Sequence, residues 1–145
     1  MTSLPLKIGP LSISRDSEPV VIAEAGLDHG GDYSRMVDLI EASAVAGAKI
    51  FKTQHYHADD LVGQASKDWH ERMLARQLSD DDIAAAKKRT ERNNMIFLCT
   101  PHTEQALSFL IDLKVQALKI GSGEVGNWPF IERAADTGIP LIIST

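Results

Sequence analysis

The sequence predicts an α/β protein built on a parallel sheet, and two observations lead to this fold class. Five short, nearly continuous apolar runs have the composition of strands that are buried on both faces. Segments with helical hydrophobic periodicity separate these runs, and strict alternation of strand and helix implies right-handed crossovers. The alternation alone is compatible with a doubly wound open sheet and with a (β/α) barrel.

The expected strands are rich in Val, Ile, Leu, Phe and Ala. In chain order they are 20–25, 50–54, 95–100, 117–120 and 141–145. A weaker run over 6–13 contains the turn-forming residues Gly9 and Pro10, so we expect an N-terminal hairpin or an edge ribbon there.

Four longer helices are expected between the strands, each with an apolar stripe or a recognisable end. The first ends near Gly47, the second begins at the N-cap candidate Ser79, and the fourth closes at Gly138. The residues that indicate these helices are Met36, Leu39 and Ile40 for the first, Asp80, Asp81 and Asp82 for the second, Leu107, Leu110 and Ile111 for the third, and Asn127 and Pro129 for the fourth.

The connection over 55–78 is too long for a plain link between strand and helix. We expect it to contain a short helix near 67–76, with Trp69 and His70 packed inside the loop. Long connections of this kind are often functional lids.

Composition excludes several classes of protein. A chain of 145 residues with 43% hydrophobic residues has the balance of a folded domain, and its net charge of −5 argues against a nucleic-acid-binding face. No apolar run approaches the roughly 20 residues that span a bilayer, and no secretory signal is visible. The single Cys99 excludes an internal disulfide and fits a reducing compartment, so we expect a cytoplasmic protein.

Polar residues cluster at the carboxyl end of each predicted strand, where parallel sheets bind ligands. Since alternate residues of a strand share a face, one inward set combines a carboxylate with two ammonium groups. Burying these charges is costly unless they are paired, so the surplus positive charge indicates an anionic ligand. The strand-end residues are Glu24, Lys52, Gln54, Thr100, Lys119, Ser122, Glu124 and Ser144.

Histidines offer further candidates. His29 follows the first strand directly and is the histidine that we expect to be functional. His55 and His57 could pair as metal ligands because alternation puts both imidazoles on one face, but an isolated pair of this kind is more often loop surface. We therefore assign no metal ligand within the chain. A single Lys or Glu at one strand end is likewise more often a solvated residue or a structural ion pair.

Six motifs recur in the order and spacing of a known family. They are IAEAG (22–26), HGGD (29–32), AGAKIFKTQ (46–54), FLCTP (97–101), LKIGSGE (118–124) and PLIIST (140–145). The chain thus resembles the sialic acid synthases, also called N-acetylneuraminate synthases, over the first half or so of their catalytic barrel. The resemblance implies a (β/α)8 TIM-barrel fold of which this chain holds about the first five strands. The remaining strands and a C-terminal antifreeze-like domain would lie beyond Thr145 in a longer protein.

The resemblance also implies an activity. Members of this family condense phosphoenolpyruvate with an N-acetylhexosamine-type sugar aldehyde, giving a nine-carbon 2-keto acid and phosphate. A divalent metal, Mn²⁺ or Mg²⁺, would assist, with its two histidine ligands beyond Thr145, and the oligomer would be a homodimer. By resemblance the catalytic residues are Glu24, Lys119 and Glu124, and the substrate-binding residues are Lys52, Gln54, Thr100, Ser122, Ser144 and His29.

Departures from the family pattern fall on the expected sugar side. The loop after the first strand reads Asp28-His29-Gly30-Gly31 in place of Asn-His-Asn-Gly, and His102 follows Thr-Pro where an aromatic residue is common. The motif at Lys52 reads Lys-Thr-Gln-His in place of Lys-Phe-Gln-Thr. Two other functions fit the strand-end residues: a class I aldolase with Lys119 as Schiff-base lysine, and a non-catalytic anion-binding half-barrel.

Overall fold

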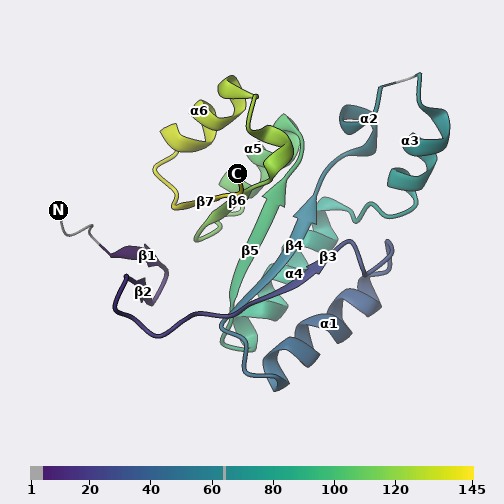
Figure 1. Ribbon diagram of the computed structural model, residues 1–145. Helices are drawn as coiled ribbons and strands as arrows, with labels where there is room; N and C mark the ends of the chain where they lie inside the picture. The colour runs from purple at the N-terminus through teal and green to yellow at the C-terminus, as the bar shows by residue number, and fades with distance from the viewer. Residues whose placement is uncertain (1–4, 64) are drawn as a thin grey trace.

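The computed structural model describes residues 5–63 and 65–145 and contains one five-stranded parallel sheet (Figure 1). Its strands are hydrogen-bonded in the order in which they occur in the chain. They are β3 (Ile22–Gly26), β4 (Ile50–His55), β5 (Ile96–Pro101), β6 (Leu118–Ile120) and β7 (Leu141–Ile143). The structure confirms the α/β class and the five predicted strands, arranged as the first part of a barrel-type sheet.

Helices connect the strands as the alternation predicts. They are α1 (Tyr33–Val45), α2 (Ala58–Leu61), α3 (Lys67–Leu74), α4 (Asp80–Arg92), α5 (Glu104–Asp112) and α6 (Trp128–Asp136), with a 3-10 turn η1 (Ser122–Glu124) after β6. The expected short helix in the long connection is α3, whereas α2 was not predicted. In Figure 1, α2 and α3 lie together beyond the carboxyl end of β4.

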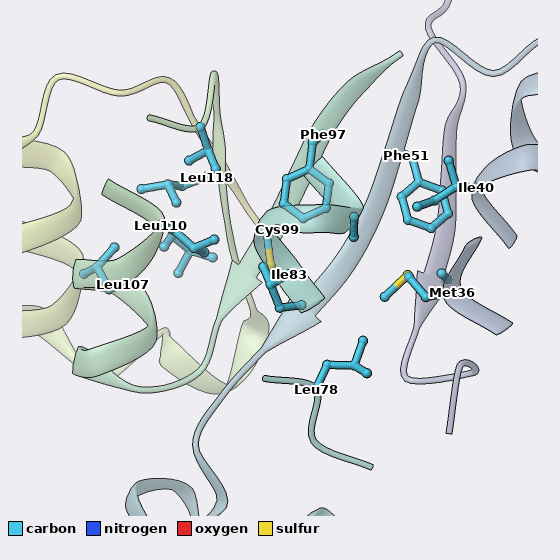
Figure 2. Packing of buried hydrophobic residues seen from close by; sticks show 14 of the residues in the cluster. Met36, Ile40, Phe51, Leu78, Ile83, Phe97, Cys99, Leu107, Leu110 and Leu118 are labelled. Carbon is cyan, nitrogen blue, oxygen red and sulfur yellow. The ribbon is translucent and has the colours of Figure 1, made fainter. Parts of the chain in front are cut away.

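The sheet buries one face against the helices. Met36 and Ile40 of α1 pack in one cluster with Phe51 of β4 and Phe97 of β5, and the helical stripe residue Leu110 belongs to the same cluster (Figure 2). This cluster is the main core, as the predicted helical stripes require.

The opposite face carries a second, smaller cluster made by Ile50, Ile96 and Leu98. The strands β1 (Leu6–Ile8) and β2 (Leu11–Ile13) form the expected antiparallel hairpin, and it places Ile8 in this cluster. The inward residues predicted from strand alternation therefore do share a face, with apolar residues in the first half of the strands and polar ones beyond them. The hairpin covers the apolar half, so the polar half is where a ligand can approach.

The long connection differs from its expected packing in one respect. The Trp69 side chain is 53% exposed, so the expectation that it packs inside the loop was wrong. His70 does contact the loop, because its Nε2 lies 2.7 Å from Asp59 Oδ1. A cluster of Tyr56, Ala58, Val62 and Met73 fills the interior in place of the tryptophan. No helix in the described part of the chain has the length and apolar character that crossing a membrane requires.

Helix α4 begins with a capping box, which gives a first testable prediction. The Ser79 hydroxyl accepts the backbone N–H of Asp82, and the Asp82 carboxylate accepts the backbone N–H of Ser79. We expect Ser79→Ala to lower the free energy of unfolding by about 1 kcal/mol, because one helix N–H loses its partner. Ser66→Ala is the matched control, since Ser66 caps α3 without a side-chain hydrogen bond. Equal losses in the two variants, measured by urea unfolding, would contradict the assignment.

Candidate active site

The polar half of the inner sheet face begins with an ion pair. The parallel register of β3 and β4 sets Glu24 directly beside Lys52, and the two side chains form a salt bridge. The Lys52 side chain is 14% exposed and that of Glu24 is 44% exposed. One of the two predicted ammonium groups is therefore neutralised within the site.

The second ammonium group, on Lys119, lies on the same face because Leu118 and Ile120 point into the helix-side core. Its Nζ donates hydrogen bonds to the backbone carbonyl of Ile120 at 2.8 Å and to the hydroxyl of Ser144 at 2.5 Å. Both acceptors are neutral. The contacts described for Lys119 thus leave its positive charge without a counterion.

Burial perturbs both lysines. Desolvation lowers the pKa of Lys52, and the positive charge of Lys119 lowers it further. The two ammonium groups are thus close enough to repel each other. Desolvation also lowers the pKa of Lys119. An anion placed between these groups would relieve both effects, since an opposite charge favours the ammonium form. The inner face is therefore suited to an anionic ligand.

A second group of polar residues borders this face. His102, directly after β5, has its Nε2 3.1 Å from Gln54 Oε1. Burial chiefly lowers the pKa of His102, the Glu124 carboxylate opposes that shift, and Lys52 and Lys119 add to it. His102 and Glu124 also line one pocket of about 450 Å³, where Asn127 donates to Glu124 at 2.8 Å. The charges of both lysines and of Glu124 therefore all act on His102.

The remaining predicted residues are placed less uniformly. Thr100 is buried at the end of β5, and Ser122 is exposed in the turn η1 after β6. His29 is buried, and its Nδ1 accepts the backbone N–H of Gly31 at 3.1 Å within its own loop. Its Nε2 is buried without a hydrogen-bond partner in the described part of the chain. The structure therefore joins Glu24 to Lys52 and Lys119 to Ser144, but it describes no contact between His29 and these pairs.

Sequence reasoning did not assign His102, although it noted this residue as a departure from the family pattern. The available signal was its position, because it is the first residue after β5. Its link to Gln54 joins residues 48 apart in the chain, and no local pattern reports such a contact.

Two buried histidines and one half-buried histidine give a pH prediction. Burial is the main cause that lowers the pKa of His29, His55 and His102 below the ordinary value of 6.5. The unfolded chain then binds more protons than the folded one below that pH, so the free energy of unfolding should fall as the medium is acidified. Urea unfolding at about pH 5.5 and pH 7.5 tests this. His102→Gln should reduce the slope, and stability that stays level between the two pH values would contradict the expectation.

Potential metal ligands lie near this site but not on its inner face. In the described part of the chain, one group of three metal-ligand side chains comes together: His55, His57 and Asp80. It is compatible with a divalent ion, but His55 lies on the opposite face of β4 from Gln54, since adjacent strand residues alternate. Among the residues that the structure describes, the inner face itself holds no such group.

Fold and site together define a class: a parallel β/α sheet that brings two lysines together on its inner face, at the carboxyl ends of the strands. The model of the NeuB family matches residues 39–145, and the chain belongs to this family. The N,N'-diacetyllegionaminic acid synthase of Legionella pneumophila is 35% identical over 86% of this chain and 39% of its own length. Human N-acetylneuraminate-9-phosphate synthase is 27% identical over 86% of this chain and 38% of its own length.

Solved structures agree with this assignment. The N-acetylneuraminic acid synthetase of Leptospira borgpetersenii, solved with citrate, matches with a TM-score of 0.91 and 30% identity over 97% of this chain and 49% of that one. A phospho-2-dehydro-3-deoxyheptonate aldolase from Thermotoga maritima, 12% identical with a TM-score of 0.69, shares the fold. The resemblance inferred from the motifs is thus confirmed. The chain spans about two fifths of the length of the curated relatives it matches.

Proposed function

We propose that the protein containing this chain condenses phosphoenolpyruvate with an N-acetylhexosamine-type sugar aldehyde, giving a nine-carbon 2-keto acid and phosphate. The single observation that carries the proposal is the pair of lysines on the inner face, of which Lys119 contacts neutral oxygens. A ligand with a phosphate and a carboxylate requires such surplus positive charge. The names of the Legionella and human relatives, both synthases of sialic-acid-type sugars, support the same reaction class.

In this proposal the strand ends hold the anionic groups of phosphoenolpyruvate. Lys119 lies where its ammonium can move from the Ser144 hydroxyl to a ligand oxygen, and Ser144 then becomes a donor to the same ligand. The other side chains that would share this role are Lys52, Thr100 and Ser122.

The carboxylates would move protons. Addition to a carbonyl creates an alkoxide that must be protonated, and water must be deprotonated as it adds to the carbon that loses phosphate. Glu24 of β3 and Glu124 of η1 would serve these two carbons. Gln54 and His29 would bind the sugar. A divalent Mn²⁺ or Mg²⁺ would supply Lewis-acid polarisation of the aldehyde. We further propose that the protein is a cytoplasmic homodimer.

The test is phosphate release by the full-length protein. Release that requires both phosphoenolpyruvate and an N-acetylhexosamine or its relatives supports the proposal. Absence of release with every such aldehyde, in a protein shown to be folded, would refute it. Binding of phosphoenolpyruvate without turnover would instead favour a non-catalytic anion-binding role.

One observation keeps a second candidate open. Because desolvation lowers the pKa of Lys119, its amine is closer to the neutral form that a class I aldolase needs for a Schiff base. Borohydride treatment in the presence of pyruvate decides between the two reactions. A stable adduct on Lys119 favours the aldolase, and its absence removes that candidate.

A further inference from the structure

Two imidazoles and one carboxylate converge at the carboxyl end of β4, outside the anionic site. His55 is the last residue of β4, His57 precedes α2, and Asp80 is the first residue of α4. The Nε2 atoms of His55 and His57 lie 2.8 Å and 3.0 Å from the same oxygen of Asp80. The three ligand atoms all lie within 4.8 Å of one another.

The surroundings hold these groups in place. The His55 side chain is 1% exposed and its ring packs against Phe109 of α5, with 5.3 Å between the ring centroids. His57 lies edge-on to His55, and its Nδ1 is buried without a hydrogen-bond partner in the described residues. The polar contact described for each ring is therefore the Asp80 oxygen. Asp80 is 41% exposed, which leaves a route for an ion and a water molecule.

The donor set selects the kind of metal. Two imidazole nitrogens and one carboxylate oxygen suit Zn²⁺ and its neighbours among the late first-row metals, whereas Mg²⁺ and Ca²⁺ prefer oxygen ligands. Tetrahedral Zn²⁺ bonds of about 2.0–2.2 Å place ligand atoms about 3.3 Å apart. The two imidazole–carboxylate distances of 2.8 Å and 3.0 Å would have to lengthen slightly to reach that spacing. The two imidazole nitrogens lie within 4.8 Å of each other and would adopt the same spacing by side-chain rotation.

The position of the group points to a structural role. Residues 56–79, here called the excursion, contain α2 and α3 and have a small core of their own around Tyr56 and Met73. His55 directly precedes this segment, His57 is its second residue, and Asp80 directly follows its end. An ion bound by all three would close this loop, and closing a loop is how metal clips stabilise a fold.

We propose that His55, His57 and Asp80 bind one Zn²⁺ ion, or a similar late first-row metal ion, which holds the two ends of the excursion together at β4 and α4. Water takes the fourth position on the exposed side of Asp80. This site is independent of the condensation proposed above and of any metal that the reaction uses.

The test compares metal content among variants of the full-length protein, so that ions bound elsewhere cancel. Each protein is dialysed against Zn²⁺, and its bound zinc per chain is measured by metal mass spectrometry. A second sample is dialysed against Co²⁺, and its bound cobalt is followed by visible absorption. We expect His57→Ala and Asp80→Asn each to bind one equivalent fewer than the wild type. His70→Ala is the matched control, because His70 forms a similar contact with Asp59, and it should retain the full content. The same content in all four proteins overturns the proposal.

Proteolysis gives a second readout that does not depend on counting ions. Trypsin can cut within the excursion at Lys67, Arg72 and Arg76. Zn²⁺ should slow these cuts in the wild type and in His70→Ala but not in Asp80→Asn, whose side chain keeps its size. Zn²⁺ protection that persists in Asp80→Asn would overturn the structural role.

Discussion

Lys119→Met is expected to lower kcat/KM for phosphoenolpyruvate by about 100-fold or more in the full-length protein. Losing one preorganised charge-stabilising donor typically costs about 10²–10³-fold, and Lys119 is the ammonium whose described partners are neutral. Met keeps the length of the apolar stem, so packing against the sheet changes little. Steady-state phosphate release at varied phosphoenolpyruvate concentration measures the effect.

Two further variants separate this role from general effects of charge. Lys7→Met removes an exposed lysine on β1 and should leave kcat/KM unchanged. Ser144→Ala removes the hydroxyl that Lys119 contacts and should cost less, about fivefold to tenfold, as expected for one neutral hydrogen-bond partner. Wild-type kcat/KM in folded Lys119→Met would contradict the binding role.

The sheet and its inward face could be predicted because strand alternation is a local property. In β4 the polar residues Lys52 and Gln54 interrupt an otherwise apolar run, and this identifies which alternate set lies on the inner face of the sheet. In β6 the short run allows one assignment of the faces. Lys119 lies between two apolar residues that pack in the core, so its own side chain lies on the inner face. The structure confirms both assignments, and the salt bridge of Lys52 follows from parallel register alone.

The contacts between distant segments could not be predicted in the same way. Asp80 fitted a helix N-terminus in the sequence, and its convergence with His55 depends on how the excursion returns to the sheet. The sequence pattern indicated the two histidines as a possible ligand pair, but it did not indicate that the Asp80 carboxylate contacts both of them. Tertiary packing of a 24-residue connection, rather than any local pattern, brings the three groups together.

His29 illustrates a related difficulty. A histidine that follows a strand end has the position of a functional residue, yet position does not determine where the ring points. Here the loop turns through Gly30 and Gly31, both with positive φ, and the ring packs inside that turn. A side chain at Gly31 would meet the carbonyl of Ala75 at the end of α3, so glycine is required there. The role of His29 in sugar binding stays a prediction.

Phe97→Ala is expected to lower the free energy of unfolding by about 3–5 kcal/mol, because the substitution leaves a cavity in the centre of the helix-side core. Phe97 is 2% exposed on β5, the middle strand of the sheet, and packs among residues from several helices. The substitution should also loosen the candidate active site, because Thr100 lies at the end of the same strand and His102 directly follows it. Urea unfolding followed by circular dichroism measures the change.

Val45→Ala provides the comparison for that core substitution, since its side chain is 90% exposed at the end of α1. Its effect should stay within about 0.5 kcal/mol, because exposed apolar side chains contribute little to folding. If Phe97→Ala and Val45→Ala lowered stability equally, the helix-side cluster could not be the main core. The strand ends would then need another support to hold two ammonium groups close together, because their mutual repulsion opposes that arrangement.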